Sequence, residues 1–179
     1  VMLYKKGQPL ATANYRPVGL NQTLGKLWTK LVTDTLTAYA DQHHIISEAQ
    51  EGCLAGRSTA RQLRNMVNTI EDAALTGQDL FVLYVDFSSA FNMVDHAKLL
   101  DVMQQLGFPC VAVDAVKDIY TGVTTRVRAK GCLSDPIHVT RGTIQGDTLS
   151  PFLFLVFIEP LLRWLQAGGQ GYEYGCLTK

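Results

Sequence analysis

Residues 80–86 read Leu-Phe-Val-Leu-Tyr-Val-Asp, a run of six apolar residues that ends on an acid. A run of this length between polar flanks is typical of a strand buried on both faces, because a buried helix needs a longer stretch. We therefore expect a buried strand over Leu80–Val85, with Asp86 where the chain leaves the sheet. A carboxylate in this place can bind a metal or a substrate, or it can simply end the strand or cap the next helix.

Apolar residues at helical spacing lie on both sides of this strand. Ser58 or Thr59, Asp95 and Ser150 stand where helix N-caps are expected, and Pro151 suits the first turn of the last helix. We expect the first helix to bury one stripe, formed by Leu24, Leu27, Trp28, Leu31, Val32 and Leu36. The spacing predicts helices near residues 23–40, 58–76, 95–106, 111–120 and 150–166.

The remaining segments indicate antiparallel strands. Residues 1–22 predict a short extended hairpin or arm, because Pro17 excludes a helix there. Thr124–Lys130 alternates cationic residues with small or apolar ones, which predicts a half-buried strand. After Gly131 this strand is expected to pair with Ile137–Thr140 as a hairpin. Helices combined with antiparallel strands place the chain in the α+β class.

Composition limits the function classes. The chain has 179 residues, and 47% of them are hydrophobic, which is enough for one core. No apolar run reaches the roughly 18 residues that a membrane span needs. The four cysteines form no CxxC pair, so reduced buried thiols are expected rather than a zinc site or a disulfide framework. The net charge is zero, yet residues 1–33 carry five cations and no acid, a local charge that could line a groove for a polyanion.

A second candidate site lies before the last helix, where residues 142–151 read Gly-Thr-Ile-Gln-Gly-Asp-Thr-Leu-Ser-Pro. Two glycines and a capped helix start can aim backbone N–H groups at a phosphate or a nucleotide. An ordinary strand-to-helix turn, with glycines only for tight backbone angles, fits the same residues. The pairs His43–His44 and Asp95–His96 are expected to be structural rather than metal ligands.

Four blocks of sequence occur in a recognisable order. They are Asn14-Tyr-Arg-Pro-Val-Gly-Leu, Gln50-Glu-Gly-Cys-Leu-Ala-Gly-Arg-Ser-Thr, Tyr84-Val-Asp-Phe-Ser-Ser-Ala-Phe-Asn-Met-Val-Asp-His and Arg141-Gly-Thr-Ile-Gln-Gly-Asp-Thr-Leu-Ser-Pro. Together they resemble the reverse transcriptases of non-long-terminal-repeat (LINE-type) retrotransposons. The resemblance implies a right-hand polymerase fold, with fingers over about residues 1–78 and an antiparallel palm sheet backed by helices over about 79–179.

The resemblance also implies a reaction and its residues. The enzyme would be an RNA-directed DNA polymerase that transfers dNTPs onto a primer 3′-hydroxyl with two Mg²⁺ ions. Asp86 and the backbone carbonyl of Phe87 would bind the metals, and Phe91 would exclude the 2′-hydroxyl of ribonucleotides. The other implied positions hold the incoming nucleotide (Lys5 or Lys6, Arg16, Gln145, Gly146) or the template backbone (Arg57, Arg61, Arg64). RNA template, DNA primer and dNTP would be the partners, in the nucleus and the cytoplasm; neither secretion nor membrane insertion is expected.

The sequence departs from the family's pattern at several places. Ser89 and Asn92 replace a usual Lys and Asp, Cys53 replaces an aromatic residue, and Thr148 replaces a Pro. The aromatic-x-Asp-Asp hairpin, which supplies the second set of metal ligands in the family, is absent from these 179 residues. We therefore expect a fragment whose second ligand set lies outside this chain, and which alone has no polymerase activity.

Two other functions stay open from the sequence. A group II intron-type reverse transcriptase has the same fold, although the Phe-Ser-x-Ala-Phe-x-x-Val-Asp-His stretch favours the LINE type. A non-catalytic or domesticated nucleic-acid-binding scaffold of this fold is the other alternative, and the presence of Asp86, Phe91 and Gln145 argues against such decay. If these residues are correctly assigned to one site, Asp86, Phe91 and Gln145 should converge on one open cleft that Arg16 overhangs.

Overall fold

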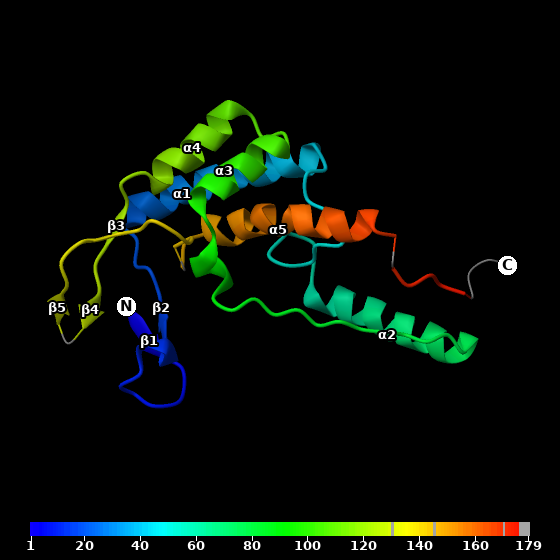
Figure 1. Cartoon of the computed structure of the whole chain (residues 1–179). Helices are drawn as coiled ribbons and strands as arrows, with labels where there is room; N and C mark the ends of the chain where they lie inside the picture. The colour runs from blue at the N-terminus through cyan, green and yellow to red at the C-terminus, as the bar shows by residue number, and fades with distance from the viewer. Residues whose placement is uncertain (130, 145, 170, 176–179) are drawn as a thin grey trace.

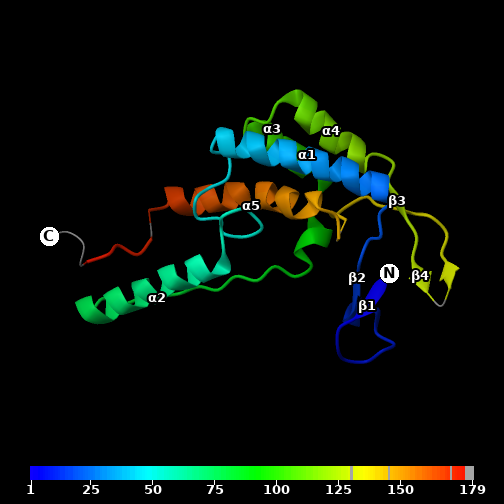
Figure 2. The ribbon, with the colours of Figure 1, turned by 180° about the vertical axis from the view of Figure 1, so that it is seen from behind.

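The computed structural model describes residues 1–129, 131–144, 146–169 and 171–175. Its body is a group of four helices (Figure 1): α1 (Thr23–Gln42), α3 (His96–Gln105), α4 (Cys110–Tyr120) and α5 (Leu149–Ala167). The fifth helix, α2 (Thr59–Thr76), projects away from this body, and both views of the ribbon show it apart from the other four (Figures 1 and 2).

The core lies between α5, α3, α4 and α1. Its fully buried side chains include Leu99 and Met103 of α3 and Leu149 and Leu153 of α5. α5 is apolar around most of its circumference, as expected for a helix at the centre of a core. Its length and composition would also suit a membrane span, a property that buried core helices share.

Local sequence signals explain most helix ends. Ser58 caps α2, where its hydroxyl accepts from the Arg61 N–H, and Gly77 ends the helix in a left-handed conformation with φ +68°. Asp95 caps α3 by accepting from the Lys98 N–H. α5 confirms the helix predicted near residues 150–166, but Ser150 is not its N-cap. Thr148 precedes the first helical residue, and the Ser150 hydroxyl lies inside the first turn, where it donates to the Ile144 carbonyl at 2.7 Å.

The strands form three separate antiparallel pairs, in agreement with the α+β class. β1 (Met2–Tyr4) pairs with β2 (Tyr15–Pro17), which confirms the N-terminal hairpin. β3 (Thr124–Thr125) pairs with β6 (Ile137–His138), and β4 (Arg128–Ala129) pairs with β5 (Cys132–Leu133). Between the last two pairs, the Val127 N–H bonds to the Ser134 hydroxyl instead of a backbone carbonyl, which interrupts the expected hairpin.

The prediction of a central strand over Leu80–Val85 is wrong. Leu80–Val85 is extended, but it belongs to no sheet, and Phe81 and Leu83 are 92% and 86% exposed. The segment runs beside α2 in both views (Figures 1 and 2), where the Tyr84 hydroxyl contacts Met66 Sδ at 3.5 Å. An apolar run indicates a strand only if neighbouring strands accept its hydrogen bonds, and no described strand lies beside it.

Other burial expectations also differ. In the stripe expected on α1, Leu36 is buried, but Leu24 and Leu27 are 79% and 58% exposed. The part of α1 that packs on α5 is its second half, which explains why the stripe is buried only there. The cysteines were expected to be buried, but three of them are exposed: Cys53, Cys110 and Cys132. Cys176 lies outside the described residues.

Candidate functional site

The glycine turn before α5 (residues 142–148) is joined to the short 3₁₀ helix η2 (Ala90–Met93). The Gly142 N–H donates to the Val94 carbonyl at 2.7 Å, and the Thr143 N–H donates to the Phe91 carbonyl at 2.8 Å. Gly142 has φ +86°, and a Cβ there would lie 2.8 Å from Asn92 Cα. Only glycine allows this close approach, so the turn and η2 are fixed relative to each other.

Phe91 is held from the other side by α5. Its ring centroid lies 5.0 Å from that of Phe154, with the two planes tilted by 40°. The side chain is half-buried, and its carbonyl is engaged by Thr143 as described above. The ring therefore has a fixed place beside the glycine turn.

The N-terminal hairpin reaches the same turn. Gly146, with φ +106°, packs so closely that a Cβ there would lie 3.0 Å from the Gly19 carbonyl oxygen and 3.5 Å from Val18 Cγ1. Arg16 lies on β2, two residues before Val18, and is exposed. Lys5 and Lys6, also exposed, lie on the same hairpin, whose strands run side by side in Figure 1.

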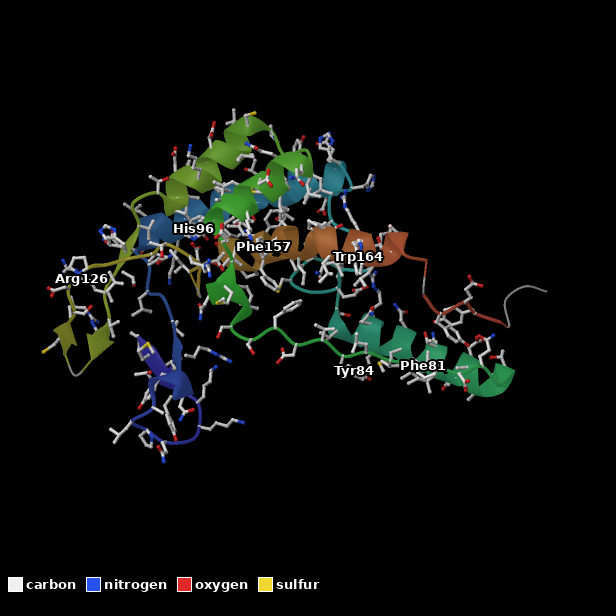
Figure 3. The ribbon with its side chains drawn as sticks, in the orientation of Figure 1. Phe81, Tyr84, His96, Arg126, Phe157 and Trp164 are labelled. Atoms are coloured by element: carbon white, nitrogen blue, oxygen red, sulfur yellow. The ribbon has the colours of Figure 1, made fainter. Side chains whose placement is uncertain are left out.

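Asp86 and Phe87 lie on the extended segment that leads into η2. Both side chains are exposed, Phe87 by 47%, and no described residue forms a hydrogen bond or an ion pair with the Asp86 carboxylate. Figure 3 shows Phe81 and Tyr84, the preceding aromatic residues of this segment, alongside α2. Gln145 lies outside the described residues. The structure brings the backbone of Phe91 and Gly146, with the residues that follow the hairpin, to one turn, and the convergence of Asp86, Phe91 and Gln145 on one cleft stays a prediction.

The acids of the described residues do not form a complete metal centre. No group of three or more His, Cys, Asp and Glu side chains lies close enough to hold an ion in the part of the chain that the structure describes. Two closely spaced Mg²⁺ ions need several hard oxygen ligands. Asp86 with one carbonyl does not by itself fit two ions.

Asp95 and His96 support the glycine turn, in line with the structural role expected for them. The hydrogen bond from the Lys98 N–H holds the pKa of Asp95 below its ordinary value, and the nearby positive charges of Arg141 and Lys98 lower it further. His96 Nε2 lies 2.8 Å from the Gly142 carbonyl oxygen, and its ring stacks on Tyr120 at 4.6 Å. Burial raises the pKa of Tyr120 to about 12, so this residue stays uncharged beside the turn.

The three arginines expected at the template differ in their surroundings. Arg57 is half-buried, and its Nη1 donates to the Ser47 and Gln50 carbonyls at 2.7 and 2.6 Å. Arg61 pairs with Glu51 at 2.6 Å. Burial raises the pKa of Glu51, but hydrogen bonds from Arg61 and Ser58 and the charge of Arg57 outweigh this and lower it. Arg64 is exposed, and no described residue forms a hydrogen bond or an ion pair with its guanidinium.

The sequence analysis missed an ion pair between the buried Glu159 and the exposed Arg163, which anchors the loop after α1. Glu159 of α5 has no exposed surface, and its Oε1 accepts from the Ser47 N–H at 3.1 Å and from Arg163 Nε at 3.0 Å. Arg163 also donates to the Ile45 carbonyl at 2.6 Å. An acid inside an apolar helix, with an Arg four residues later, is the signal that could have revealed this pair.

Comparisons with known proteins identify the family of the chain. Residues 3–174 match the family model described as reverse transcriptase (RNA-dependent DNA polymerase). A probable RNA-directed DNA polymerase from transposon BS of Drosophila melanogaster is 28% identical over 162 residues, which are 90% of this chain and 18% of that protein. The RNA-directed DNA polymerase from mobile element jockey of the same species is 30% identical over 162 residues, which are again 90% of this chain and 18% of that protein.

A relative from another animal extends the similarity. The transposon TX1 uncharacterized 149 kDa protein of Xenopus laevis is 30% identical over 165 residues, which are 92% of this chain and 12% of that protein. The chain therefore spans between 12% and 18% of the length of these three relatives.

Proposed function

The chain belongs to the reverse transcriptase (RNA-dependent DNA polymerase) family, and from this premise we propose that it forms part of an RNA-directed DNA polymerase of a LINE-type retrotransposon. The polymerase would work on an RNA template and a DNA primer, in the nucleus after assembly in the cytoplasm. One observation carries the proposal: the glycine turn, η2 and the cationic hairpin meet at one end of α5.

In this proposal residues 1–78 belong to the fingers and residues 79–179 to the palm of a right-hand polymerase. The contact of Gly146 with Val18 and Gly19 supports this division, because it joins the N-terminal hairpin to the turn before α5. An arm that touches the nucleotide-side turn is suited to close over a bound nucleotide.

The hairpin would hold the triphosphate. Lys5, Lys6 and Arg16 are exposed and lie on one short hairpin without a nearby acid in its sequence. Their charges would neutralise the phosphates of an incoming dNTP, and Arg16 can bind two phosphate oxygens at once. Gly146 and Gln145 would pack beside the sugar and the base.

Phe91 would exclude ribonucleotides. Because its ring packs on Phe154 and its backbone is bonded to Thr143, the side chain cannot easily turn aside. A bulky ring fixed under the sugar leaves no space for a 2′-hydroxyl, so deoxynucleotides would be preferred.

Asp86 and the carbonyl of Phe87 would be ligands of Mg²⁺, with the remaining ligands outside this chain. When bound, such a metal pair supplies activation of the primer 3′-hydroxyl and stabilisation of the leaving pyrophosphate. Asp86 is exposed and no described residue pairs with its carboxylate, which supports this role because the carboxylate can take a cation.

A primer-extension assay tests this function. A full-length polymerase that contains this chain should copy an RNA template into DNA with dNTPs, whereas the 179 residues alone should not. Binding of RNA by the full-length protein without any extension would contradict the enzyme and favour the non-catalytic scaffold. A maturase domain beside the polymerase would instead favour the group II intron type.

A further inference from the structure

An open groove lies between α1 and α4, beside the turn that carries Gly146. Its volume is about 840 Å³, and it is formed by the start of α1, one face of α4 and the turn before α5. Figures 1 and 2 show α1 and α4 side by side. The lining residues that matter for its chemistry are Leu20, Trp28, Val111, Asp114, Asp118 and Asp147.

The groove offers apolar side chains to solvent. Val111 is 80% exposed, Leu20 is 67% exposed and Trp28 is 56% exposed. Large apolar side chains gathered in a groove, rather than scattered singly, are typical of a surface that a partner covers. Trp28 is also a residue type that often dominates binding energy at interfaces.

Three carboxylates accompany these apolar side chains. Asp114 and Asp118 lie one turn apart on α4, both are exposed, and no described residue pairs with either. Asp147 is only 5% exposed, and its Oδ1 accepts from Thr29 Oγ1 at 2.6 Å. The three carboxylates therefore give the groove an acidic lining.

The negative charge of the groove favours a cationic partner. No Lys or Arg is among its lining residues. The N-terminus of α1 adds roughly half a positive charge, against the full negative charges of three carboxylates. A nucleic acid, whose phosphates these carboxylates would repel, is therefore disfavoured here. A polypeptide with both cationic and apolar side chains is favoured.

We propose that this groove binds a basic amphipathic helix of a protein partner. Apolar side chains of that helix would lie on Trp28 and Val111, as in other helix-in-groove complexes. Two Lys or Arg residues one turn apart would pair with Asp114 and Asp118, which have the same spacing on α4. The groove is thus a protein-docking surface on a chain whose proposed substrates are nucleic acids.

The test uses the 179-residue chain with Trp164→Phe, which leaves Trp28 as the fluorescent tryptophan. The probe is a synthetic amphipathic helix made of leucine, alanine and lysine, with lysines one turn apart. It should shift the Trp28 emission and bind saturably, and Asp114→Asn/Asp118→Asn should weaken binding about ten-fold or more. The matched control, Asp79→Asn/Asp135→Asn, changes the same charge outside the groove and should leave binding unchanged.

Three results would overturn the proposal. One is equal binding by the Asp114→Asn/Asp118→Asn variant and its control. Another is equal binding of a peptide in which glutamate replaces each lysine. The third is displacement of the peptide from Trp28 by a short RNA oligonucleotide, which would show that the groove takes nucleic acid. Circular dichroism of each variant tests whether the substitutions leave the fold intact.

Discussion

Gly142 joins two parts of the candidate site through a backbone approach that no side chain permits. Gly142→Ala should destabilise the chain by about 1–3 kcal/mol more than Gly122→Ala. Both glycines have positive φ, but a Cβ at Gly122 meets nothing within 4 Å, so this control isolates the contact with Asn92. Urea unfolding of the two variants measures the difference. Equal losses of stability would show that the approach of the turn to η2 has no energetic importance.

Phe91 is the residue that should set the choice of sugar. In a full-length polymerase, Phe91→Ala should reduce the discrimination against ribonucleotides by on the order of 100-fold, because the fixed ring is removed from beneath the sugar. Single-nucleotide incorporation of dNTP and rNTP measures the ratio. Phe81→Ala is the control, since that ring is 92% exposed on the same segment. An unchanged ratio would remove Phe91 from the nucleotide site.

At the scale of elements, Glu159 and Arg163 tie the loop after α1 to α5. Arg163→Met should cost about 1–3 kcal/mol, because it leaves the fully buried Glu159 carboxylate without its cation. The amide of Ser47, which donates to Glu159, should then exchange its hydrogen faster. A double variant with Glu159→Gln should lose less stability than the two single losses added together. Unchanged exchange at Ser47 would contradict the anchoring role.

The helices were predictable because their signals are local. Ser58, Asp95 and Gly77 act at the helix ends through contacts with residues only a few positions away. The strand predicted over Leu80–Val85 is not formed, because a strand depends on partners distant in the sequence, which the local pattern does not reveal. Ser150 shows a smaller failure of the same kind: its hydroxyl turns to the Ile144 carbonyl, a contact that the capping pattern does not reveal.

Motifs predicted part of the arrangement around the candidate site, whose role stays a prediction. The glycine turn, Phe91 and the hairpin do lie together, since Gly146 and Thr143 make the contacts that join them. The template arginines show the limit of that reasoning. A motif fixes the place of Arg57, but only the fold shows that its guanidinium is already bonded to the Ser47 and Gln50 carbonyls. The place of Asp86 relative to the turn stays a prediction.

At the scale of the whole molecule, the exposed apolar surface should govern behaviour in solution. Leu63 of α2 and the neighbouring Phe81 and Leu83 are between 64% and 92% exposed. The chain should therefore bind a hydrophobic dye and self-associate. Leu63→Glu/Leu83→Glu should reduce both effects while leaving the unfolding midpoint unchanged, whereas Leu153→Glu in the core should unfold the chain. A monomeric chain without dye binding would contradict this prediction.

The assignment of Asp86 is the centre of the functional account, and templated primer extension measures it most directly. In a full-length polymerase that contains this chain, Asp86→Ala should lower the extension rate by on the order of 1,000-fold or more, because a metal ligand is lost. Asp79→Ala, which removes an exposed acid earlier in the same segment, should keep the rate. If extension continues at the original rate after Asp86→Ala, the proposed mechanism is wrong.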